Sequence, residues 1–174
     1  MGRTTRALFS HLPYRTARRL AADLLASQGI GSGGDLRNSG EVNVLKLVRS
    51  VSPVLVDVGG FAGDYTAMFL DRFPTGRAFV FEPSPAHFAV VQRRLAGRPA
   101  QCFEMALGAT AGSTTLYKDE TISGLASLTR RDLRHVRREM SINEAVLIDT
   151  LDAVTGKQRI DAMPPPSQPS PPPR

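Results

Sequence analysis

The residues best suited to bind a small molecule form a short glycine-rich stretch directly after an apolar run. Residues 54–58 (VLVDV) carry a single acid, Asp57, and otherwise read as a strand buried in a parallel sheet. Gly59, Gly60 and Gly63 follow within five residues, which frees the backbone for unusual dihedral angles and for close approach by a ligand. Apolar residues at helical spacing come next. Strand, glycine turn and helix in this order are typical of a site that holds a nucleotide-like cofactor at a helix N-terminus.

A second acid, Glu82, lies 19 residues after Gly63 at the end of another short apolar run, residues 77–82 (RAFVFE). In dinucleotide-type folds, an acid at the end of the second strand accepts hydrogen bonds from ribose hydroxyls. A carboxylate suits this task because it offers only acceptors to two adjacent donors. A lone strand-end glutamate more often does nothing, but the glycine turn at the correct interval favours ribose binding. Asp57 has a simpler interpretation, compatible with a binding role, as an acid that fixes the turn by accepting backbone N–H groups.

The glycine spacing indicates which kind of cofactor the turn would bind. From Gly59 to Gly63 the sequence reads G-G-x-x-G, so the pyrophosphate fingerprint G-x-G-x-x-G is absent. This absence disfavours an NAD-dependent oxidoreductase. A turn that opens after a strand-end acid is more typical of S-adenosylmethionine binding, in which no pyrophosphate has to be held.

The surrounding pattern predicts the elements that hold this site. Ser84 and Pro85 suit the N-cap and the first position of a helix that ends before Gly97. Residues 101–107 (QCFEMAL) predict a third strand, and residues 114–117 predict a further short strand. Two βα units joined by short turns imply right-handed crossovers, so we predict an α/β fold with a Rossmann-like parallel sheet and flanking helices.

The remaining segments predict helices without chemistry of their own. Tyr14–Ser27 carries an apolar stripe, and residues 40–49 predict a second short helix. We expect both to cover the sheet. Thr129 and Asp132 have the three-residue spacing of a capping box, which predicts a helix from Thr129 to about Met140.

Composition and charge narrow the function. A length of 174 residues suggests one domain with a real core. The net charge of +6 and the arginines of residues 130–138 would suit RNA, but a solvated arginine face is the commoner explanation and no nucleic-acid motif is present. Cys102 is the only cysteine, so we expect a cytoplasmic protein without a disulfide framework or a metal site. No apolar run is long enough to cross a bilayer, so we expect no membrane span. His87 and His135 have no partner that the sequence identifies.

Five stretches, taken in order, resemble the FkbM-type family of S-adenosylmethionine-dependent methyltransferases over roughly residues 41–161. They are residues 54–66 (VLVDVGGFAGDYT), 78–88 (AFVFEPSPAHF), 106–107 (AL), 124–128 (GLASL) and 146–152 (VLIDTLD). The resemblance implies a Rossmann-like fold and O-methyl transfer, often to sugar or polyketide-type hydroxyls.

The resemblance also implies roles for individual residues. Asp57, Gly59 and Gly63 match the family's first motif, whose turn includes Gly60, and Glu82 matches its ribose-binding acid. By the same resemblance, the residues that contact the adenine are Glu104, Met105 and Ala106.

The chain departs from the family pattern at two places. Members usually read D-x-G-A-N-x-G, whereas Gly60 and Phe61 replace the alanine and the asparagine here. The family also continues through a strand like I-D-x-L-K-I-D-V-E-G. Residues 159–163 match the beginning of this strand, but residues 164–174 are rich in proline. Each proline removes a backbone hydrogen-bond donor, so this stretch cannot pair as a central strand. We therefore expect three regions. Residues 1–39 form a basic helical segment, residues 40–163 form a methyltransferase domain that lacks the C-terminal half of its sheet, and residues 164–174 form a disordered proline-rich tail.

The combined prediction is a methyltransferase that uses S-adenosyl-L-methionine and a small-molecule or sugar hydroxyl as acceptor, weakened or inactivated by truncation. No catalytic base is identified. Two alternatives remain open at this point, a non-catalytic cofactor-binding remnant and an RNA-binding or RNA-modifying protein.

Overall fold

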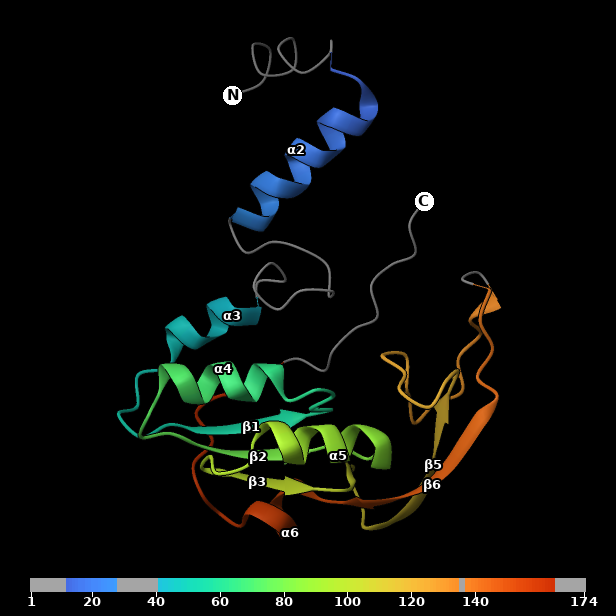
Figure 1. Ribbon diagram of the computed structural model, residues 1–174. Coiled ribbons are helices and arrows are strands. Elements are labelled where there is room, and N and C mark those ends of the chain that lie inside the picture. The colour runs from blue at the N-terminus through green and yellow to red at the C-terminus, as the bar shows by residue number, and fades with distance from the viewer. Residues whose placement is uncertain (1–11, 28–40, 135–136, 165–174) are drawn as a thin grey trace.

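A computed structural model describes residues 12–27, 41–134 and 137–164 (Figure 1). Its helices and strands follow the order α2 (Tyr14–Ser27), α3 (Glu41–Val44), η1 (Leu45–Leu47), β1 (Val54–Val58), α4 (Asp64–Arg72), β2 (Arg77–Phe81), α5 (Pro85–Arg94), β3 (Ala100–Phe103), β4 (Ala106–Leu107), β5 (Gly112–Lys118), β6 (Ile142–Asp149) and α6 (Leu151–Thr155). In the part of the chain that is described, no helix is long and apolar enough to cross a membrane.

The first sheet is parallel, with the order β1-β2-β3, and it confirms the predicted α/β fold class. Helix α4 connects β1 to β2 and helix α5 connects β2 to β3, so two consecutive βα units build the sheet. Val54 pairs with Arg77 and Val58 with Phe81, so β1 and β2 end at the same level. The segments that follow the two strands, the glycine turn and the residues around Glu82, therefore meet at one edge of the sheet.

Both faces of the first sheet are covered, which explains why its strands are apolar almost throughout. One face packs against α4, α5 and η1 through a buried cluster that includes Leu55, Val80, Phe69, Val91 and Leu45. The opposite face packs against α6 and the chain after β3 through Val54, Val56, Phe79 and Phe81, with Leu151 and Val154 of α6 packed against them. Alternate residues of each strand thus serve opposite faces, as the two-residue period of a strand requires.

A second sheet has the order β4-β6-β5 and was only partly predicted. The expected strand over residues 101–107 divides into β3 and β4, which belong to different sheets. β4 pairs in parallel with β6, and β5 pairs with β6 in antiparallel register over its whole length. The short strand expected at residues 114–117 lies within β5. The break between β3 and β4 redirects the chain from one sheet to the other at Glu104 and Met105.

The segment after α6 returns to the free edge of β1. Ala162 forms a parallel bridge with Leu55, and Val56 N donates to the Ala162 carbonyl at 3.0 Å. The Asp161 carboxylate accepts a hydrogen bond from Val54 N at 3.0 Å. β1 therefore lies between β2 on one side and this segment on the other. In open α/β sheets, ligands bind beyond the carboxyl ends of the strands where the strand order reverses, and the glycine turn leaves β1 at such a point.

The helix predicted to begin at Thr129 is absent from the described residues 129–134 and 137–140, and that prediction was wrong. Local side-chain hydrogen bonds compete with the helix there. The Asp132 carboxylate accepts from Arg134 N at 3.0 Å, and the Met140 sulfur accepts from Arg131 N at 3.3 Å. Arg137 has a φ of 57°, which is incompatible with a continuous right-handed helix. His135 lies outside the described residues.

The two N-terminal helices have different outcomes. Tyr14–Ser27 is helical, as predicted, but its apolar residues Leu20, Leu24 and Leu25 are exposed, so the expectation that this helix covers the sheet was wrong. The second predicted helix appears as α3 followed by the single turn η1, and its Leu45 is fully buried in the core. Most of the predicted tail, residues 165–174, lies outside the described part of the chain.

Candidate cofactor site

The glycine turn between β1 and α4 is held against the end of β2. Gly59 N and Gly60 N both donate to the carbonyl of Phe81, at 2.8 and 3.2 Å. Gly59 has a φ of 79° and Gly63, the N-cap of α4, has a φ of 74°. Side chains are strongly disfavoured at both angles, so the backbone itself requires glycine at these two positions.

Gly60 is required for a different reason, namely its contact with β2. A Cβ added there would lie 2.5 Å from Cγ1 of Val80 and would force that side chain to move. The neighbouring Phe61 has a φ of 46°, a left-handed conformation that asparagine tolerates far better than phenylalanine. The asparagine of the family pattern would thus suit this backbone, and Phe61 occupies it under strain.

Asp57 lies beneath the turn and stabilises it. The side chain is buried, and its carboxylate accepts a hydrogen bond of 2.6 Å from the Thr66 hydroxyl in the first turns of α4. This contact ties the end of β1 to the helix that follows the turn. This contact supports the interpretation of Asp57 as an acid that fixes the turn, although the donor of the bond is the Thr66 hydroxyl and not one of the expected backbone N–H groups.

Glu82 joins the ends of β1 and β2. Its carboxylate accepts hydrogen bonds from Phe61 N at 2.9 Å and from Ser84 N at 3.0 Å, and the residue is only 4% exposed. His87 Nδ1 lies 3.6 Å from the same carboxylate. Two carboxylate oxygens offer about four acceptor sites, so these contacts leave capacity for a ligand hydroxyl. Ser84 is the N-cap residue of α5, as predicted, although its hydroxyl does not cap the helix.

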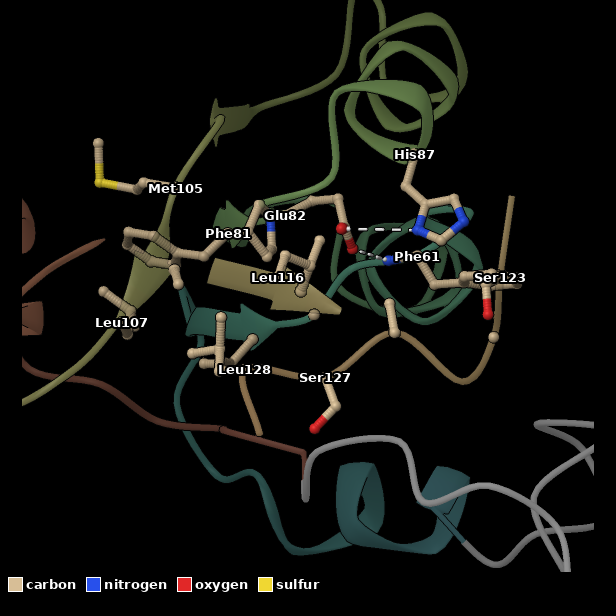
Figure 2. A pocket seen from close by; sticks show the side chains of 16 residues that line it. Phe61, Phe81, Glu82, His87, Met105, Leu107, Leu116, Ser123, Ser127 and Leu128 are labelled. Atoms are coloured by element: carbon tan, nitrogen blue, oxygen red, sulfur yellow. Dashed lines mark hydrogen bonds and ion pairs between the residues drawn. The ribbon is translucent and has the colours of Figure 1, made fainter. Parts of the chain in front are cut away.

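A cavity of about 230 Å³ opens beside Glu82 (Figure 2). Most of its wall is apolar, and the polar groups are few and come from Glu82, His87, Ser123 and Ser127. Its lining residues are Val58, Gly59, Phe61, Phe81, Glu82, Pro83, His87, Met105, Ala106, Leu107, Leu116, Ser123, Gly124, Ala126, Ser127 and Leu128. An apolar pocket with a few convergent polar groups is the usual form of a small-molecule site.

The structure brings together part of the predicted set of site residues. Gly59, Glu82, Met105 and Ala106 line the cavity. Three others, Asp57, Gly60 and Gly63, shape the turn from behind and do not line the cavity. Glu104 is exposed and lies outside the lining as well. Among the described residues, no cluster of three or more histidine, cysteine or acidic side chains is arranged to hold a metal ion.

Several lining residues were not predicted as part of the site. His87 was left without a partner, yet it is 3% exposed, faces Glu82 and packs its ring edge-on against Phe61 with 4.7 Å between the centroids. Its place in the first turn of α5, five residues after the strand-end acid Glu82, was the available signal. Residues of the stretch from Ser123 to Leu128, all except Leu125, line the opposite wall. The stretch 124–128 was noted only as part of a resemblance and without a role, because the second sheet, which carries it to the cavity, was only partly predicted.

A buried lysine connects the second sheet to the first. Lys118, at the end of β5, is fully buried. Its Nζ donates to Glu144 Oε1 at 2.6 Å, to Ser84 Oγ at 3.2 Å and to the Thr121 carbonyl at 3.2 Å. The Ser84 hydroxyl that could have capped α5 therefore accepts from Lys118 instead. These contacts fix the distance between the two walls of the cavity.

Asp119 anchors the loop that carries the second wall. Its carboxylate accepts hydrogen bonds from the Ser123 hydroxyl and from Arg138, whose guanidinium lies 2.5 Å away. Burial alone would raise the pKa of the Asp119 carboxyl, but the hydrogen bonds from Arg138 and Ser123 outweigh it and hold the pKa below its usual range.

The arginine-rich stretch is partly neutralised by its own neighbours. Arg138 pairs with Asp119 and Glu120, and Arg134 pairs with Asp132. Two of its arginines thus serve ion pairs within the chain, which weakens the case for a nucleic-acid surface.

No protein-family model matches the sequence, and no curated protein matches it. Among solved structures, the chain is similar to the sugar N-methyltransferase KedS8 from Streptoalloteichus sp ATCC 53650, with 29% identity over 45% of this chain and 31% of that one and a TM-score of 0.32. It is also similar to CalS10, an amino pentose methyltransferase from Micromonospora echinaspora involved in calicheamicin biosynthesis, with 22% identity over 58% of this chain and 41% of that one and a TM-score of 0.33. The chain thus spans less than half the length of either protein.

Proposed function

We propose that the chain is an S-adenosylmethionine-dependent methyltransferase domain of the FkbM type, spanning residues 40–163. The observation that carries this proposal is the meeting of the glycine turn after β1 with the Glu82 carboxylate after β2, and the apolar cavity that opens beside them. This combination lies where the strand order reverses, the usual ligand position in open α/β sheets.

The residues present suit such a cofactor. Glu82 retains acceptor capacity for ribose hydroxyls, and Met105 and Ala106 give the cavity an apolar side suited to an adenine ring. The cavity of about 230 Å³ is smaller than the roughly 300–1,000 Å³ of typical drug-sized sites, so we assign to it the nucleoside part of the cofactor. Asp57, Gly60 and Gly63 would act indirectly, by holding the turn in shape, and Glu104 would contact the adenine only from outside the present cavity.

The reaction that we propose is O-methyl transfer to a hydroxyl of a small molecule or a sugar. When bound, the cofactor supplies an electrophilic methyl group. The contribution of this chain would be to bind and orient, because alignment of the reacting atoms supplies much of the rate in such displacements. The apolar residues Phe81, Leu116 and Leu128 would exclude water from the bound nucleoside.

A transfer assay with methyl-labelled donor and a panel of sugar and polyketide-type hydroxyl acceptors tests this function. We expect slow but measurable formation of labelled product by the wild-type chain, in keeping with the predicted weakening of its activity. The variant Ala106→Leu, which narrows the cavity at a buried position, should lose most of the activity, whereas Ala109→Leu at an exposed position nearby should retain it. Equal activity in both variants would contradict the proposed site. Binding of S-adenosylhomocysteine without any transfer would instead favour a non-catalytic cofactor-binding protein.

A further inference from the structure

His87 is a buried histidine whose role the fold does not explain. It is 3% exposed, and its Nδ1 lies 3.6 Å from Glu82 Oε1. Figure 2 shows the imidazole between the Glu82 carboxylate and the Phe61 ring. Phe61 holds this position at a φ of 46°, which is costly for phenylalanine. The strained backbone places an aromatic edge against the imidazole and so helps to fix the plane of its ring.

The second nitrogen of His87 is buried and has no hydrogen-bond partner among the described residues. Buried polar atoms are nearly always paired in native proteins, so an unpaired one in a cavity wall indicates a missing partner. The neighbouring carboxylate accepts hydrogen bonds and cannot donate, so it favours the tautomer with the proton on Nδ1. Nε2 then carries a lone pair and is available as an acceptor.

We propose that His87 is a ligand-binding residue whose Nε2 accepts a hydrogen bond from a ribose hydroxyl of the adenosine-containing cofactor. The inference rests on the proposed function and extends it to a residue that the sequence did not assign. The Glu82 carboxylate and His87 Nε2 both present acceptors, and the two residues line the same cavity. Two adjacent hydroxyls of a ribose present two donors. The two side chains would thus share the diol, one hydroxyl each.

Two isosteric variants separate this role from a purely structural one. In His87→Asn the amide reproduces the position of Nδ1 but nothing replaces Nε2, whereas in His87→Gln the amide reaches the position of Nε2 and the contact with Glu82 is lost. We expect calorimetric titration with S-adenosylhomocysteine to show about tenfold weaker binding for His87→Asn and binding within about threefold of wild type for His87→Gln. The reverse order would overturn the proposal, because it would show that His87 acts only by holding Glu82.

Adenosine and its deoxy forms identify the partner of Nε2. One of the two deoxy forms, the one that lacks the hydroxyl bound by Nε2, should abolish the difference between wild type and His87→Asn, because the variant can lose a contact only when the ligand offers it. A difference that persists with both deoxy forms would overturn the ribose assignment. Unchanged binding of S-adenosylhomocysteine by His87→Asn would also overturn it, and would leave a buried water as the partner. No binding of S-adenosylhomocysteine to the wild-type chain would instead refute the proposed function itself.

Discussion

The two walls of the cavity are built by different means. The first wall comes from β1, β2 and the glycine turn, where each contact joins segments close in sequence or strands in register. The second wall comes from the loop after β5, and long-range ion pairs of Lys118 and Arg138 fix it in place. The first wall is therefore encoded in local periodicity and in glycine positions. The second depends on charged side chains whose partners only the tertiary structure reveals.

This difference has a consequence for stability. Removal of a contact in the first wall should disturb a turn and the packing behind it. Removal of an ion pair in the second wall should leave a buried or half-buried carboxylate without its partner, which costs more than the pair contributes. We therefore expect the larger losses in the wall that is harder to predict.

The largest effect is expected from Lys118→Met. The change removes the donor to Glu144, Ser84 and Thr121 and leaves the Glu144 carboxylate, already short of partners, unpaired. We expect a loss of about 3 kcal/mol in the free energy of unfolding, measured by urea denaturation. The double variant Lys118→Met/Glu144→Leu should recover a large part of this loss, because it removes both charges. A single variant as stable as wild type would show that the lysine does not hold the two sheets together.

Gly60→Ala tests the packing of the first wall. The added methyl group would meet Val80 Cγ1 at 2.5 Å, so we expect a loss of about 2 kcal/mol from overpacking. Gly112→Ala is the matched control, because a Cβ there has no neighbour within 4 Å. Combined with Val80→Ala, the Gly60→Ala change should cost less than the two single changes added together. Strict additivity would contradict the contact.

A smaller effect is expected from acid. The pKa of Asp119 is below its ordinary value of 3.8 in the folded chain, so the carboxylate binds protons more readily when unfolded. The stability that it contributes is complete above the unfolded pKa and is lost as the pH falls through the folded pKa. Arg138→Ala should weaken this dependence, seen as a shallower fall of the unfolding free energy with acid below about pH 4. An identical acid dependence in both proteins would argue against the Arg138 contact.

The smallest predicted effect concerns Cys102 on β3. Burial, and to a lesser extent the charge of Asp57, raises the pKa of its thiol above the usual 9.0. Since the thiolate is the reactive form, alkylation at about pH 8 should be several times slower in the folded chain than in urea. Equal rates would indicate that β3 does not pack as described.

Sequence reasoning was successful where local physics decides the structure. Apolar periodicity predicted the parallel strands, and Pro85 predicted the start of α5. The glycines predicted the turn, and the positive φ angles of Gly59 and Gly63 show why glycine is needed there. Sequence reasoning failed at the Thr129 helix, where Asp132 binds the backbone of Arg134 instead of capping a helix. It also missed the roles of Lys118 and His87, because a charged residue at the end of a strand and a histidine in a helix have no distinctive local pattern. Their roles arise from partners far away in sequence or across a turn.

The most direct test of the cofactor site is a calorimetric titration of the wild-type chain with S-adenosylhomocysteine and, separately, with NAD. A turn without the pyrophosphate fingerprint, next to the carboxylate that we propose to bind ribose, should give saturable one-to-one binding of S-adenosylhomocysteine and at least tenfold weaker binding of NAD. Absence of S-adenosylhomocysteine binding, or tighter binding of NAD, would contradict the assignment of this site.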